Sequence, residues 1–273
     1  MGEGFSGGTL LLVLVGSAVA ALLAMAVTAA VARRVGKVAV VDITWGLVFV
    51  LIGWVAYALG QHSGRSLLLA VLVTLWGGRL AWHIRGRALG QGEDPRYAKM
   101  LSEVPEEQRF RHALVRVFGT QAVAAWFVSL PLQVAAATSG ALGWVAALGV
   151  VVYLVGVTFE AVGDAQLKAF KADPANKGKI MDRGLWRYTR HPNYFGDSAV
   201  WWGLWVVAAG AWPGVLTILS PVVMTYFLAF ATGARLLESE MAKRPGYPEY
   251  MERTSMFFPL PPKKGSASSG ASA

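Results

Sequence analysis

The sequence contains no cysteine and has few charged residues. Charged residues make up 15% of its 273 positions, whereas a soluble domain has about 25%. The lack of cysteine excludes disulfide bonds and thiolate metal or redox sites. The four histidines are scattered, and a Walker loop, a His-Glu-x-x-His pair and a three-glycine dinucleotide fingerprint are all missing. We therefore expect no metal site and no Rossmann domain.

Long apolar runs are abundant instead, because hydrophobic residues make up 55% of the chain. Runs of about 20 such residues are typical of transmembrane helices. We count seven, at residues 10–32, 38–59, 66–84, 113–136, 141–163, 195–211 and 213–233. Helices of this kind satisfy their own backbone hydrogen bonds inside a bilayer. The predicted fold is therefore an all-α, polytopic membrane bundle of about seven transmembrane helices.

The predicted organisation is one membrane domain, residues 1–258, followed by a disordered tail, residues 259–273, of Pro, Lys, Gly, Ser and Ala. Glu3 and no base precede the first run, which is also too long for the apolar region of a signal peptide. We therefore expect the first run to remain as a helix.

The basic residues lie almost entirely on one side of the predicted membrane. They gather at 33–37, 85–116, 168–190 and 235–264, while Arg65 falls on the other side. This asymmetry predicts an N-terminus outside and a C-terminus in the cytoplasm, in a protein of the bacterial inner (plasma) membrane. Topology and attraction to anionic lipids account for the net charge of +9, so we expect no nucleic-acid partner.

The segment from Gly184 to Asp197 has the highest density of polar chemistry. Its candidate nucleotide-binding side chains, with the preceding arginine, are Arg183, Arg187, Tyr188, Arg190, His191, Asn193 and Asp197. Arginines at this density predict a clamp for a pyrophosphate or a ribose phosphate, and a three-residue spacing would put Arg187 and Arg190 on one helical face. Asn193 fits a carboxamide or a ribose edge. The alternative is an ordinary interfacial belt of arginine and aromatic residues.

Acidic residues occur within the predicted spans, near their cytoplasmic ends. They are Asp42, Glu160, Asp164 and Asp197. Ionisable groups inside a membrane are candidates for a functional site. The functional interpretation is a polar pocket walled by the second, fifth and sixth spans, and the alternative is acids that are hydrated or paired with neighbouring bases.

Taken together, the motifs resemble the DUF1295 branch of the steroid 5-alpha-reductase-like membrane oxidoreductases. The matching residues are Asp42 with Trp45, Arg79-Leu80, Asp94–Tyr97, Glu160, Asp164, Gln166, 184–196, Leu237-Glu238, Tyr247, Tyr250, Arg253, Thr254 and Pro259. Sterol C14- and C7-reductases share the Arg-His-Pro-Asn-Tyr-x-Gly-Asp string, and isoprenylcysteine methyltransferases share it more loosely. The resemblance covers nearly the whole chain.

The resemblance implies NADPH bound from the cytoplasm and a lipid substrate that enters from the bilayer. Carried over to this chain, the cofactor contacts are Asp164, Tyr188, Arg190, His191, Asn193, Tyr194, Asp197 and Glu238. Steroid reductases polarise an enone carbonyl with a Gln-Glu pair and a tyrosine. Asp42 and Trp76 lie near those positions here, and Trp76 has no hydroxyl.

The expected function is hydride transfer from NADPH to an activated C=C bond of a steroid, sterol, isoprenoid or other lipid, as in a 3-oxo-5-alpha-steroid 4-dehydrogenase. Asp42 and Tyr194 are the candidates for hydrogen bonding or proton delivery, and Trp45 and Glu160 for contacts with the substrate. Two alternatives stay open. One is a membrane methyltransferase that uses S-adenosylmethionine, and the other is a non-catalytic lipid-binding protein.

Overall fold

The computed structural model describes residues 4–263, and these are helical with two isolated β-bridges and no β-strand. The all-α, polytopic membrane bundle is therefore confirmed. The chain divides into two compact units, each described separately below. Unit 1 comprises Met1–Val150 and Leu204–Ser220, and unit 2 comprises Val151–Gly203 and Pro221–Ala273.

All seven expected spans fall on helical structure. The helices that carry them are α1 (Gly7–Val35), α2 (Val40–Leu59), α3 (Gly64–Ala88), α6 (Thr120–Val128) with α7 (Leu130–Ala136), α8 (Trp144–Ala172), α9 (Pro192–Ala209) and α10 (Leu219–Tyr226). Five stretches are long and apolar enough to cross a membrane, or six if the bent stretch that ends with α7 counts as one span. Helix α9 is not among them, since it begins with the polar motif.

The bend in the fourth expected span lies between α6 and α7. The two parts meet at an angle of 48°, with Ser129 between them. Pro131 lies in the first turn of α7, where its missing N–H removes no helical hydrogen bond. The same span begins with α5 (Glu106–Ala113) and a π-helical stretch, η1 (Leu114–Gly119). The fourth span is thus a broken helix rather than a straight one.

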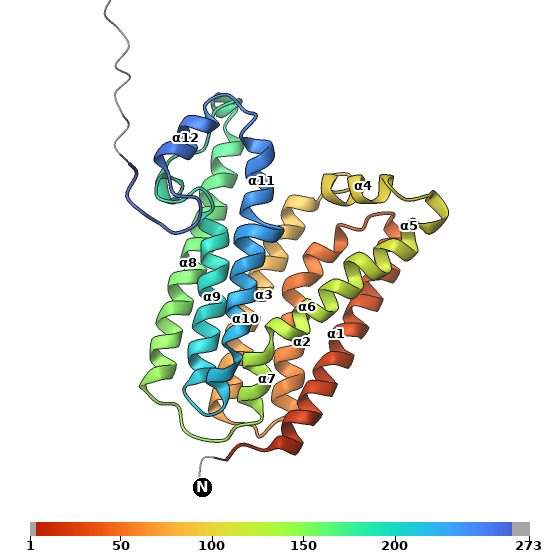
Figure 1. Ribbon diagram of the computed structural model, residues 1–273, viewed down its shortest axis with the longest axis vertical. Helices are drawn as coiled ribbons and strands as arrows, with labels where there is room; N and C mark the ends of the chain where they lie inside the picture. The colour runs from red at the N-terminus through yellow and green to blue at the C-terminus, as the bar shows by residue number, and fades with distance from the viewer. Residues whose placement is uncertain (1–3, 264–273) are drawn as a thin grey trace, which may run out of the picture. The chain divides into compact units, whose positions relative to one another are not determined.

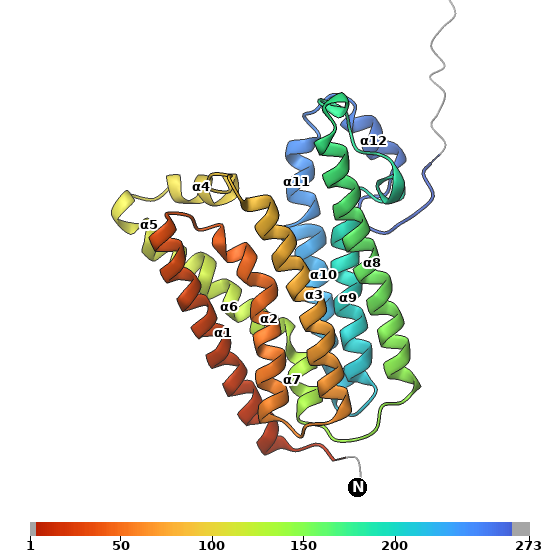
Figure 2. The same ribbon diagram turned by 180° about the vertical axis from the view of Figure 1, so that it is seen from behind.

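In unit 1, α2 lies between α1 and α3, as both ribbon views show (Figures 1 and 2). The loops at one end are joined by hydrogen bonds: the Gln61 side chain donates to the carbonyls of Gly4 and Ala137. The buried Arg65 guanidinium donates to the carbonyls of Ala141 and Gly210 at 3.0 and 3.2 Å. The charge-poor loops of unit 1 therefore meet at one end.

The opposite end of unit 1 contains the basic loops. The Glu93 carboxylate accepts from the backbone N–H groups of Val38 and Ala39, at 2.5 and 2.9 Å, and so caps the start of α2. The Lys37 ammonium donates to the carbonyl of Gln91. Helix α4 (Pro95–Ser102) follows directly, with Asp94 as its N-cap. The separation of basic and charge-poor loops at opposite ends of unit 1 matches the charge pattern of the sequence. Which end faces the cytoplasm stays a prediction.

In unit 2, α8 and α9 approach each other through glycine. A Cβ atom on Gly196 would lie 2.4 Å from the Glu160 backbone nitrogen, and one on Gly156 would lie 2.5 Å from that of Val200. Only glycine permits this distance. Beyond these helices follow η5 (Phe227–Ala231), α11 (Ala234–Met241) and α12 (Tyr247–Arg253).

The C-terminal segment returns to the motif in unit 2. A parallel bridge joins Thr189 to Ser255, and the Leu260 N–H donates to the Tyr188 carbonyl. Of the tail expected to be disordered from Pro259 onwards, residues 259–263 belong to this segment. Residues 264–273 lie outside the described residues.

Candidate functional site

A buried ion pair holds the motif in unit 2. The Arg190 guanidinium donates from Nε and Nη2 to the two carboxylate oxygens of Glu238, at 2.6 and 2.9 Å. Both side chains are less than 10% exposed. A two-pronged pair of this kind fixes orientation as well as distance. The chain between η3 (Gly184–Arg187) and α9 is thereby held against α11.

The remaining Arg190 contacts are to backbone carbonyls at the end of α12. Its Nη1 atom donates to the backbone carbonyls of Met251 and Thr254, which end α12. Four hydrogen bonds to protein groups therefore surround this guanidinium. The sequence predicts Arg190 as part of a phosphate clamp, and that role stays a prediction, while the structure shows Arg190 linking the motif to α11 and α12.

Arg187 and Arg190 do not share a face, which corrects the expectation from their spacing. The 3₁₀-helix ends at Arg187, and the chain then turns into the bridge between Thr189 and Ser255. As a result Arg187 is exposed while Arg190 is buried. Arg183 is exposed as well, with its guanidinium over the Phe170 ring. Of the three predicted arginines, Arg183 and Arg187 are therefore the two that solvent, and hence a phosphate, can reach.

His191 also contacts the buried ion pair of Arg190 and Glu238. Its Nε2 lies 3.1 Å from a Glu238 carboxylate oxygen. Since an ionised carboxylate only accepts, Nε2 carries the proton in this contact. The Tyr194 ring stacks on the imidazole at 5.5 Å between centroids, with 6° between the planes. The ion pair thus sets the position of Tyr194, one of the predicted catalytic residues.

Asn193 joins the motif to the acids of α8. Its side-chain amide donates to an Asp164 carboxylate oxygen at 3.2 Å and accepts from the Tyr194 backbone N–H. Glu160 lies one turn before Asp164, and Asp197 lies one turn after Asn193. All three acids are less than 10% exposed. The structure therefore brings together in unit 2 the polar residues predicted on the fifth and sixth spans.

Tyr247 and Tyr250 of α12 belong to the same site, although from the sequence they are predicted only as family matches. The Tyr250 hydroxyl donates to the Trp186 carbonyl. Burial raises the pKa of Tyr247 to about 12, and the nearby Glu238 charge acts in the same direction. Tyr247 therefore stays protonated at neutral pH. The signal for both tyrosines is the Tyr-x-x-Tyr spacing, which places them on one face of a helix.

A second polar cluster occurs in unit 1, around Asp42. The Tyr97 hydroxyl donates to one Asp42 carboxylate oxygen at 2.7 Å, and Arg96 donates to the other at 2.8 Å. Asp94 also accepts from Arg96. Asp42 is predicted from the sequence as a catalytic group, whereas its partner Arg96 is not predicted. The available signal was the Asp-Pro-Arg-Tyr string, which the structure brings to the start of α2.

The electrostatics of the Asp42 cluster favour a protonated tyrosine. Burial raises the pKa of Tyr97 far above its ordinary value, and the Asp42 carboxylate adds to this effect. Burial would also raise the pKa of Asp94, but hydrogen bonds from Arg96 outweigh it and lower that pKa. Trp45, the predicted substrate contact, lies one turn after Asp42 and packs edge-on against Phe49 at 4.9 Å. The cluster thus has a hydroxyl donor, Tyr97, and the packed rings of Trp45 and Phe49 follow Asp42 along α2.

The predicted site residues therefore fall into two groups. Asp42 and Trp45 belong to unit 1, and the other predicted site residues belong to unit 2. The proposed pocket walled by the second, fifth and sixth spans stays a prediction. What the fold and these clusters define is a polytopic helical membrane protein with hydrogen-bonded polar networks, one buried around Arg190 and one partly exposed around Asp42.

Comparison with known proteins shows the family. Residues 28–254 match the model of the protein family of unknown function DUF1295, so the chain belongs to that family. An uncharacterized protein of Schizosaccharomyces pombe is 24% identical over 233 residues, covering 74% of this chain and 66% of that protein. A probable O-methyltransferase of Ustilaginoidea virens is 44% identical over 48 residues, 18% of this chain and 17% of that protein. No solved structure matches this chain.

Proposed function

We propose that this protein is an NADPH-dependent membrane reductase that acts on an activated C=C bond of a steroid, sterol, isoprenoid or other lipid. The observation that carries the proposal is the arrangement in unit 2. A buried ion pair holds a rigid motif that presents exposed arginines, an aromatic hydroxyl and an amide–carboxylate pair. The resemblance of this motif to membrane reductases supports the same function. We place the protein in the bacterial inner membrane, with unit 2 open to the cytoplasm.

The residues of unit 2 fit the chemical groups of a nicotinamide dinucleotide. Arg183 and Arg187 are exposed cations suited to phosphate oxygens. The amide of Asn193 and the carboxylate of Asp164 offer donors and acceptors for ribose hydroxyls or a carboxamide. Tyr188, 43% exposed, offers a flat face. When bound, the cofactor supplies the hydride, while the protein supplies orientation and exclusion of water.

Tyr194 is the candidate proton donor of unit 2. Its ring is held by stacking on His191, which Glu238 positions in turn. A hydroxyl with a fixed ring can deliver a proton to one carbon of a double bond as a hydride reaches the other. Arg190 has a positioning role in this scheme, because its donors bind Glu238 and two backbone carbonyls.

Methyl transfer is the second candidate, favoured by the short match to a probable O-methyltransferase. Such an enzyme would bind S-adenosylmethionine, which has no phosphate groups. The exposed arginines of unit 2 would then have no phosphate to bind, and the methionine carboxylate would be the anionic group left for them. The two candidates therefore differ in which soluble ligand the purified protein binds.

Calorimetry in detergent tests both candidates with NADPH, NADH and S-adenosylmethionine. We expect NADPH to bind about ten-fold tighter than NADH or better, since a charge-assisted hydrogen bond contributes about 1.5–3 kcal/mol. Arg187→Gln should reduce this ratio. Arg235→Gln removes another exposed charge, from α11, and should leave the ratio of the two affinities unchanged. Equal affinities for NADPH and NADH would contradict the phosphate contact, and binding of S-adenosylmethionine alone would favour the methyltransferase.

A further inference from the structure

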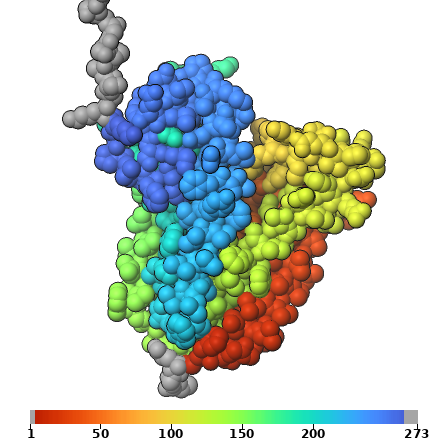
Figure 3. Space-filling view, in the orientation of Figure 1, coloured from red at the N-terminus to blue at the C-terminus, as the bar shows by residue number. Residues whose placement is uncertain are grey.

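Unit 1 carries a groove of about 440 Å³ that the proposed reaction does not use. It lies between α1 and the stretch formed by α5 and η1, which the space-filling view shows side by side in red and yellow-green (Figure 3). Its lining residues are Ala26, Ala29, Ala30, Arg33, Arg34, Phe110 and Leu114. The groove therefore has cations at one end and small apolar side chains along the rest.

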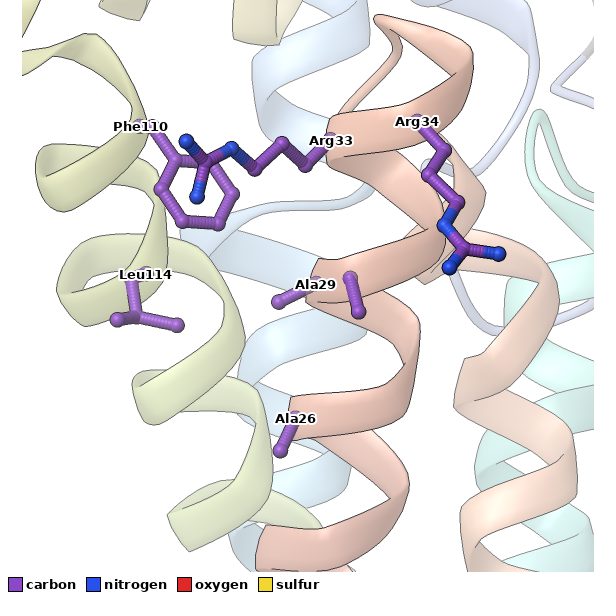
Figure 4. Close-up of a pocket in the computed structure, with 7 residues that line it drawn as sticks. Ala26, Ala29, Arg33, Arg34, Phe110 and Leu114 are labelled. Atoms are coloured by element: carbon purple, nitrogen blue, oxygen red, sulfur yellow. The ribbon is translucent and has the colours of Figure 1, made fainter.

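Arg33 defines the polar end of the groove. It lies in the last turn of α1 and reaches across to Phe110, with its guanidinium carbon 5.1 Å from the ring centroid (Figure 4). Arg34 leaves the helix on the other side. Among residues 4–263 neither arginine forms a salt bridge. A guanidinium stacked on a ring keeps its N–H edge available for an anion.

The apolar part of the groove continues onto an exposed apolar surface of α1. Ala26 and Ala30 are exposed and lie one turn apart on α1. Leu22, Leu23 and Val27 flank them at 58%, 61% and 64% exposure. An apolar face of this kind on a membrane-length helix suits hydrocarbon chains rather than water. The groove therefore combines an anion-binding end with a shallow channel for an acyl chain.

We propose that this groove binds one anionic phospholipid, with its phosphate against Arg33 and an acyl chain along Ala26 and Ala30. Phosphate diesters match the guanidinium edge, and the second cation, Arg34, favours a headgroup with net negative charge over a zwitterionic one. The positive charge of residues 33–37 also favours an anionic headgroup over a zwitterionic one. A second protein helix would satisfy the alanines but would leave the adjacent arginines without anions.

Native mass spectrometry of the full-length protein in a non-ionic detergent tests the proposal, because such a micelle has no surface charge of its own. The probes are dioleoyl phosphatidylglycerol, dioleoyl phosphatidylcholine and inorganic phosphate. We expect phosphatidylglycerol to bind at least about ten-fold tighter than phosphatidylcholine and Arg33→Gln to lose this advantage. Arg111→Gln removes an exposed charge from α5 outside the groove. Its affinity for phosphatidylglycerol should stay within about two-fold of that of the unmodified protein.

A second variant tests the acyl-chain channel without changing any charge. Ala30→Phe fills the groove at an exposed position and should weaken binding of phosphatidylglycerol while both arginines remain. Inorganic phosphate should not displace the lipid at equal concentration, because it makes no use of the channel. Equal affinity for the two lipids, equal losses in Arg33→Gln and Arg111→Gln, or efficient displacement by phosphate would each overturn the proposal.

Discussion

Arg190 shows how a residue predicted to contact a ligand can also hold the fold together. A basic residue in a polar motif suggests a ligand contact, yet its donors bind Glu238 and the end of α12. Removing one partner of a buried ion pair costs about 3–5 kcal/mol. A variant at Arg190 or Glu238 would therefore lose activity through lost stability. The exposed Arg187 is the more informative position for testing phosphate binding.

Asp42 is the residue for which a kinetic prediction is sharpest. Under the proposed function, we expect Asp42→Asn to keep NADPH affinity within about two-fold, because the nucleotide is assigned to unit 2. We propose the Tyr97 hydroxyl held by Asp42 as a second candidate for hydrogen bonding or proton delivery beside Tyr194, and on that proposal turnover should fall by about 100-fold or more. Single-turnover oxidation of NADPH with a lipid enone, alongside calorimetry, measures both quantities.

Tyrosine variants provide the controls for that experiment. Tyr97→Phe removes only the hydroxyl and should reproduce the loss of turnover, because that hydroxyl, which stays protonated at neutral pH, is the hydrogen-bond donor that the phenylalanine ring lacks. Tyr57→Phe removes a hydroxyl at the opposite end of α2 and should turn over normally. Normal turnover in Asp42→Asn would make Asp42 a structural acid. A loss of NADPH affinity in Asp42→Asn as large as its loss of turnover would show that Asp42 is wrongly assigned to the substrate.

At the scale of elements, the contact between α8 and α9 depends on two glycines. Gly196→Ala would place a methyl group 2.4 Å from the backbone of Glu160, which forces the helices apart. We expect a loss of about 1–3 kcal/mol in the free energy of unfolding, measured by denaturation in mixed micelles. The adjacent Asn193–Asp164 hydrogen bond should weaken with it, and so should nucleotide affinity.

Gly78→Ala on α3 is the matched control for this substitution. A Cβ atom at Gly78 meets nothing within 4 Å. Alanine there should be neutral or stabilising by up to about 1 kcal/mol, because it restricts the unfolded chain. Similar effects of the two substitutions would mean that helix propensity, rather than the approach of α8 to α9, determines the result.

Hydrophobic runs predict the helices well because a bilayer requires about 20 apolar residues whatever they contact. The break at Ser129 and the polar start of α9 are local features with local causes, proline in one case and the motif in the other. Partners are harder to predict. Arg190 and Glu238 are 48 residues apart, and Asp42 and Arg96 are 54 apart. Only the packing of the helices brings such pairs together, and local patterns in a single sequence do not predict which helices pack against each other.

At the scale of the whole molecule, the distribution of basic residues predicts the orientation in the membrane. Since the chain has no cysteine, single cysteines can be introduced without background labelling. Gly143→Cys lies at an exposed site in a charge-poor loop where a side chain meets nothing within 4 Å. Lys177→Cys lies at an exposed site in the basic loop that precedes the motif.

In intact cells, an impermeant maleimide should label the cysteine at position 143, and the cysteine at position 177 should react only after permeabilisation. The physical reason is that loops rich in Lys and Arg are retained on the cytoplasmic side. Full labelling of both variants in permeabilised cells is the control for reactivity. The reverse pattern in intact cells would place the motif outside, where NADPH is not supplied, and would contradict both the orientation and the proposed reductase.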